Sequence, residues 1–79
     1  MHVVYICTAG SADQTKASLP WHLAVNGSIE EGHDVSMVLA GDATELVVGG
    51  AAETWEGMGL PPMSEMVAKA REHEVPVFV

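Results

Sequence analysis

The 79-residue sequence has little cysteine, few basic side chains and no long apolar run. Its single cysteine, Cys7, leaves no partner for an internal disulfide. Three Lys and Arg stand against eleven Asp and Glu, and the net charge of −8 argues against binding to nucleic acids or anionic membranes. No apolar stretch reaches the roughly 18 residues of a membrane span, and the amino terminus lacks a basic, cleavable leader. These absences predict a cytoplasmic protein.

The chain length predicts one small domain over residues 1–79. A domain of this size buries only about 60–65% of the surface that its unfolded chain exposes, so its core is marginally stable. Small scaffolds gain stability from disulfides, metals or self-association. The four histidines show no pair at ligand spacing, which argues against a structural zinc, and we expect neither a metal nor a cofactor. Self-association is therefore the expected source of stability, and the 48% hydrophobic content agrees with it.

Three apolar runs predict three strands, which are HVVYIC (residues 2–7), Val35–Ala40 and Val75–Val79. Short continuous apolar runs are typical of strands buried on both faces of a parallel sheet.

Helical patterns fill the intervals between the predicted strands. The first runs from about Asp13 to Glu31, with a kink expected at Pro20 and Gly32 closing the helix in a left-handed conformation. A short second helix, about Ala43–Val48, follows a capping-box-like pair and stops at Gly49-Gly50. That pair is Asp42 and Glu45. A third helix opens at Pro61-Pro62.

The alternation of strands and helices predicts a small parallel sheet with helices on both faces, in flavodoxin-like layering. A sheet of only three parallel strands would also leave a long, flat apolar edge strand exposed.

Three stretches resemble proteins of the DsrE/DsrF-like family. VVYICTAGSADQTKASLPWHLA is similar to that family's opening strand, polar loop and proline-bearing helix. EEGHDVSMVLAGDATELV is similar to its second strand and helix, and GLPPMSEMVAKAREHEVPVFV to its loop, third helix and third strand. The resemblance covers the whole chain, and GLPPM is its most specific piece.

The resemblance implies a subunit of a trimer, hexamer or mixed complex that works in sulfur relay or thiol transfer, with a sulfur-carrier protein as a partner. In that family a cysteine just after the third strand carries a persulfide. Here that position and the remaining strands would lie beyond Val79, so the chain is expected to lack the family's C-terminal third. Glu74 also stands where the family pattern has glycine.

Cys7 is the remaining candidate for thiol chemistry. It lies where the first strand ends, close to the start of the first helix, whose dipole favours a thiolate and hence a persulfide carrier. The alternative is that Cys7 packs as a small hydrophobe, because free cysteine is among the most buried residue types.

Polar loops at the ends of the first two strands form a candidate binding site. Thr8, Gly10, Ser11 and Asp13 lie between strand and helix, where free backbone N–H groups can hold a phosphate, sulfate or carboxylate. Gly41 and Asp42 form the equivalent tip of the second strand, although Asp42 would repel an anion. The alternative is a plain helix cap and turn, which accounts for the same residue types.

Large apolar residues also gather between the second and third helices, at Trp55, Met58, Leu60 and Met63. They form either a subunit interface, where tryptophan and methionine are enriched, or a lid over the chain's own core. The leading functional expectation is thus a DsrE-like thiol-carrier subunit in a homo-oligomer, without an assigned catalytic residue. The alternatives are a structural or interaction subunit and a small-anion or nucleotide binder at residues 8–13.

Overall fold

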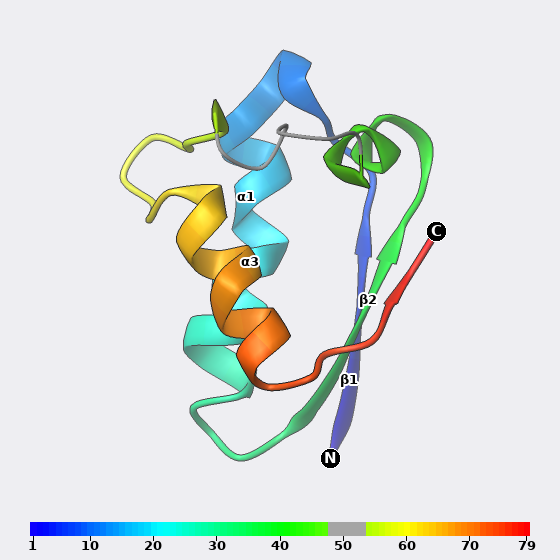
Figure 1. Cartoon of the computed structure of the whole chain (residues 1–79), viewed down its shortest axis with the longest axis vertical. Coiled ribbons are helices and arrows are strands. Elements are labelled where there is room, and N and C mark those ends of the chain that lie inside the picture. The colour runs from blue at the N-terminus through cyan, green and yellow to red at the C-terminus, as the bar shows by residue number, and fades with distance from the viewer. Residues whose placement is uncertain (48–53) are drawn as a thin grey trace.

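Three parallel strands form one layer of the fold, which the computed structural model describes over residues 1–47 and 54–79 (Figure 1). In chain order the elements are β1 (His2–Cys7), the 3₁₀ turn η1 (Ser11–Asp13), α1 (Gln14–Leu23), the π-helical turn η2 (Ala24–Ser28), β2 (Asp34–Leu39), the 3₁₀ helix η3 (Gly41–Val47), α3 (Met63–Glu72) and β3 (Val77–Phe78). The predicted α/β class and the small parallel sheet are confirmed.

The strand order β1-β2-β3 moves in one direction across the sheet. Crossovers of the same hand that move in the same direction place their helices on the same face. Accordingly, α1 and α3 contact each other and lie side by side on one face of the sheet (Figure 1). Helices on both faces, which the sequence led us to expect, would need a strand order that reverses direction.

The two faces of the sheet differ in burial because only one is covered by these helices. On the covered face, Cys7, Met37 and Leu39 are buried. On the opposite face, Val4 and Ile6 are exposed. The expectation that β1 is buried on both faces was therefore wrong: an apolar run looks the same in sequence whether one or both of its faces are covered.

The first predicted helix is present, and it changes type after Leu23. α1 continues through Pro20 and passes into the π-helical turn η2, where the Ile29 N–H donates to the Ala24 oxygen at 3.0 Å. Asn26 and Gly27 lie within this wider turn, so they do not form a separate loop. Gly32 then ends the segment at φ 84°, the left-handed conformation expected for a closing glycine.

The second and third predicted helices are shifted or shortened relative to the sequence pattern. The segment from Gly41 is a 3₁₀ helix that is described up to Val47, and the predicted end at 48–50 lies outside the described residues. α3 begins at Met63, with Pro62 as its N-terminal cap residue. β3 comprises only Val77–Phe78, so the predicted strand from residue 75 is shorter than expected.

The core lies between the sheet and the two helices. The largest fully buried side chains there are three methionines, Met37 from β2 and Met63 and Met66 from α3. Trp21 of α1 and Trp55 from the segment before α3 complete the same apolar cluster. Methionine is unbranched and fills irregular gaps, which suits a small core that is shared by elements of unequal length.

Candidate functional site

The carboxyl ends of β1 and β2 bring the predicted loop residues together. The Ala40 N–H donates to the Cys7 oxygen at 2.9 Å, which extends the pairing of the two strands beyond their last residues. The loop after β1 therefore lies against the tip of β2. A Cβ added at Gly41 would stand 3.7 Å from the Thr8 carbonyl oxygen, and one added at Gly10 would collide with the Asp42 backbone.

A carboxylate of the same chain accepts hydrogen bonds from polar groups of this loop. The Ser11 N–H donates to Glu45 Oε1 at 2.9 Å, and the Ser11 hydroxyl donates to both carboxylate oxygens. Asp13 accepts the Lys16 N–H at 3.0 Å, which makes it the N-terminal cap of α1. The Ser11 N–H is thus already paired, and an external anion at this position would meet the charge of Glu45.

This contact is not evident from the sequence, where the spacing of Asp42 and Glu45 indicates a local capping box. In the structure Glu45 instead bonds Ser11, which lies 34 residues earlier in the chain. Gly10 is the one sequence signal that could have indicated the contact, since a side chain there would collide with the Glu45 carboxylate.

Cys7 is a buried thiol. Only 2% of its surface is exposed, and it belongs to the core cluster beneath the helices. Burial raises the pKa of the Cys7 thiol from 9.0 to about 11, because a thiolate would lose its hydration there. The thiolate is the nucleophilic form, so the environment of Cys7 suppresses thiol chemistry near neutral pH.

The four residues proposed for an interface divide into two groups. Trp55 and Met63 are buried in the chain's own core. Their burial agrees with the alternative in which this segment forms a lid over the core. The Met63 N–H donates to the Trp55 oxygen at 2.9 Å and thereby ties the segment to the start of α3. Leu60 is partly buried, whereas Met58 is 88% exposed and stays free for a contact.

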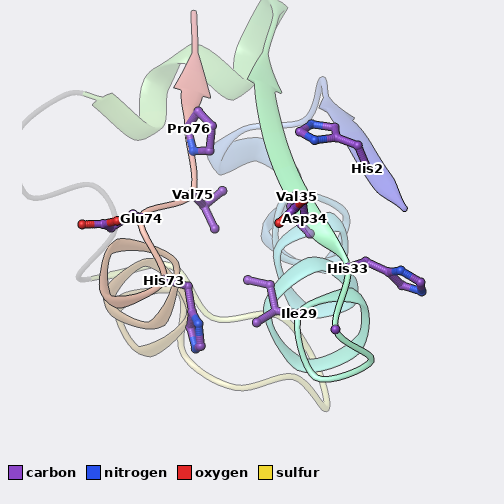
Figure 2. A pocket seen from close by; sticks show the side chains of 10 residues that line it. His2, Ile29, His33, Asp34, Val35, His73, Glu74, Val75 and Pro76 are labelled. Atoms are coloured by element: carbon purple, nitrogen blue, oxygen red, sulfur yellow. The ribbon is translucent and has the colours of Figure 1, made fainter.

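An open hollow of about 540 Å³ lies at the amino ends of the strands (Figure 2). Ile29, Val35 and Val75 contribute apolar surface to it, and its polar lining includes three histidines from three segments of the chain, His2, His33 and His73. Figure 2 shows that the three rings do not point toward a common centre.

The histidines of this hollow do not form a metal site. His2 Nε2 lies 2.8 Å from Ser36 Oγ, at hydrogen-bond distance. Across the described parts of the chain, no group of three or more His, Cys, Asp or Glu side chains could hold a metal ion. The hollow is not evident from the sequence, because its walls come together only when the strands pair.

The helix-free side of the sheet presents a small apolar surface, which we call the open face. The strand register aligns Ile6 with Val38 and Val38 with Phe78, so these three side chains form a row across all three strands. Val4, two residues before Ile6 on β1, lies on the same side. The exposed fractions of Val4, Ile6 and Phe78 are 53%, 68% and 57%.

No protein-family model, curated protein or solved structure shows a significant match to this chain. The resemblance to DsrE/DsrF-like proteins therefore stays a prediction from the sequence. None of the helices in residues 1–47 and 54–79 has both the length and the apolar character needed to cross a bilayer.

Proposed function

We propose that the chain is a non-catalytic interaction subunit that works as part of a homo-oligomer. The open face carries this proposal, because it exposes large apolar side chains on strands instead of on loops. Covering a Val, Ile or Phe side chain that is half exposed contributes about 1 kcal/mol. For a domain with a small core, a few such contributions are a large share of the total stability.

A second copy of the chain is the partner that fits this face best. Val4, Ile6, Val38 and Phe78 carry no charge, whereas the chain as a whole has a net charge of −8. Two copies that meet through an uncharged surface keep most of their carboxylates apart. Sheets also pack face to face through interdigitating apolar side chains, so the surface is compatible with itself.

The thiol-carrier function implied by the family resemblance requires an accessible thiolate. The burial of Cys7 and its raised pKa weigh against this function in the conformation described. The anion-binding alternative requires a free donor in the loop after β1, and the contact between Ser11 and Glu45 weighs against it. The interaction subunit is the remaining alternative, and it needs no group that is already paired or buried.

Sedimentation velocity over a range of protein concentrations tests the proposal. We expect the native protein to sediment as more than one chain, and Phe78→Ser to shift it toward the monomer. Met58→Ser is the matched control, because Met58 is also exposed but lies away from the sheet. A native protein that stays monomeric at the highest concentration reached would contradict the proposed function.

A further inference from the structure

Within residues 1–47 and 54–79, no strand pairs with the outer edge of β1. β1 pairs with β2 on one side and lies at the margin of the sheet. Its six residues, His2–Cys7, include no Lys, Asp, Glu or Pro. Natural proteins protect long edge strands with charges, prolines, bulges or a covering segment, because an unpaired edge is a template for pairing with another strand. At the other margin, β3 comprises two residues and follows Pro76.

An apolar groove runs along this edge between β1 and α1. It has a volume of about 330 Å³, and its lining includes Tyr5 and Ile6 from the strand and Leu19 and Leu23 from the helix. Leu19 and Leu23 lie one helical turn apart, and 46% and 49% of their surfaces are exposed. The strand and the helix therefore leave apolar surface uncovered on the same side of the molecule.

We propose that two copies of this chain join edge to edge here, with β1 of one copy pairing antiparallel with β1 of the other. The pairing would create a continuous six-stranded sheet about a two-fold axis perpendicular to it. This inference rests on the proposed homo-oligomeric function and names a contact surface for it that is separate from the centre of the open face.

Two β1 edges can also meet about a two-fold axis that is parallel to the strands. The position of α1 favours the perpendicular axis. A two-fold axis perpendicular to the sheet keeps the helices of both copies on the same face. Leu19 and Leu23 then meet the same residues of the second copy across the new junction. An axis parallel to the strands would instead place the two α1 helices on opposite faces and leave Leu19 and Leu23 uncovered.

The charge of the groove also favours a second copy as its occupant. Among the described residues that line the groove there is no Asp or Glu, although the chain has eleven of these residues. Of these described residues only Lys16 has a permanent charge, and it lies near the start of α1. The perpendicular two-fold axis places the two Lys16 side chains at opposite ends of the helix pair, so they do not face each other.

The size of the edge is sufficient for a specific contact. A six-residue strand is about 20 Å long, and a ten-residue helix is about 15 Å long, so both layers extend along much of a molecule whose extents are 32 × 25 × 19 Å. An interface of standard size takes about 800 Å² from each partner. That is roughly a sixth of the 4618 Å² surface of this chain. An isologous contact also pairs the chains, so the assembly contains an even number of copies.

The test compares native mass and sedimentation for the native protein and the double variant Leu19→Lys/Leu23→Lys. Both leucines are about half exposed, so the variant is expected to fold, which circular dichroism checks. The two new lysines reduce the net negative charge of the chain, so a loss of association cannot come from general repulsion. We expect an even-numbered native assembly and at least a tenfold weaker association in the double variant. Met58→Lys, which adds the same kind of charge elsewhere, should associate as the native protein does.

Cross-linking gives a second readout that does not depend on weakening the contact. In a Cys7→Ser background, Leu19→Cys and Leu23→Cys are oxidised separately. We expect at least one of them to give a disulfide-linked dimer, and Met58→Cys to give none.

The outcomes separate the two proposals. A monomeric native protein would overturn both of them. A native oligomer that Phe78→Ser dissociates, while Leu19→Lys/Leu23→Lys leaves it intact, would keep the proposed function and overturn the pairing of β1 edges. An odd number of chains in the native assembly would also overturn the edge pairing.

Discussion

The two faces of β1 and β2 share one backbone but meet different surroundings. On one face, Cys7 and Met37 lie under α1 and α3 and are buried in the core. On the other face, Ile6 and Val4 are exposed, although they alternate with the covered residues along the same strand. Residues of similar hydrophobicity thus stabilise the single chain on one side and are available to a partner on the other. Substitutions at neighbouring positions on the two faces test this difference.

The largest effect is expected from a pair of substitutions on β2. Met37→Ala removes a side chain that is 0% exposed and should lower the free energy of unfolding by about 2–5 kcal/mol, through lost burial and the remaining cavity. Its neighbour Val38 points to the open face, so Val38→Ala should cost about 1 kcal/mol or less. Urea unfolding of both variants at low protein concentration measures the difference. Equal losses would mean that the two faces are equally packed.

A thiol moved by one position along β1 should change its reactivity. Burial holds the pKa of Cys7 at about 11, against an ordinary value of 9.0. This shift alone lowers the thiolate fraction at pH 7 by about 100-fold. In the double variant Ile6→Cys/Cys7→Ser the thiol faces solvent, so alkylation should be at least that much faster than in the native chain. Alkylation rates measured from pH 7 to 11 test this, and the native rate should keep rising up to the top of the range.

The reactivity of the same two thiols also tests the thiol-carrier function and the formation of the oligomer. Incubation of the native protein with a persulfide donor should leave its intact mass unchanged. A gain of sulfur that is lost in Cys7→Ser would contradict the inert role of Cys7 and favour the carrier. In Ile6→Cys/Cys7→Ser, alkylation should slow as the protein concentration rises, because association covers the open side of β1.

Two glycines, Gly10 and Gly27, differ in the space that is available for an added side chain. Gly10 is buried beside the Asp42 backbone and the Glu45 carboxylate, and an added Cβ would collide with both. Gly10→Ala should therefore cost about 1–3 kcal/mol, as expected for overpacking, and should disrupt the contact between Ser11 and Glu45. Gly27 has no atom within 4 Å of an added Cβ, so Gly27→Ala should be neutral or slightly stabilising. Thermal unfolding of the two variants decides whether the loop after β1 is as tightly closed as its contacts indicate.

Much of the fold could be predicted because its signals are local. Apolar runs, helical periodicity and the closing Gly32 lie within a few residues of the elements that they indicate. The strand order could not be predicted this way, because it depends on which strands pair after distant segments come together. The side on which α1 and α3 pack follows from that order, and so does the exposure of Val4 and Ile6.

The candidate site was less predictable than the fold for a similar reason. The short spacing between Asp42 and Glu45 indicates a capping box, but a tertiary contact with Ser11 competes for the same carboxylate and prevails. For Cys7, the sequence left burial and reactivity as alternatives, since both suit a cysteine at the end of a strand. Only the packing of the helices over Cys7 distinguishes them.

The smallest effect is expected far from both faces of the sheet, at the ion pair between Glu30 and Lys69. A hydrogen bond from Lys69 and its positive charge lower the pKa of the Glu30 carboxyl below 4.5. Because the folded-state pKa is the lower one, the stabilisation is present above the unfolded-state value and is lost as the pH falls through the folded-state value. Glu30→Gln should therefore lower the melting temperature slightly at pH 7 and make no difference once the native carboxyl is protonated. Glu31→Gln is the matched control, and an equal effect of the two variants at pH 7 would show that general charge, rather than the pair with Lys69, is responsible.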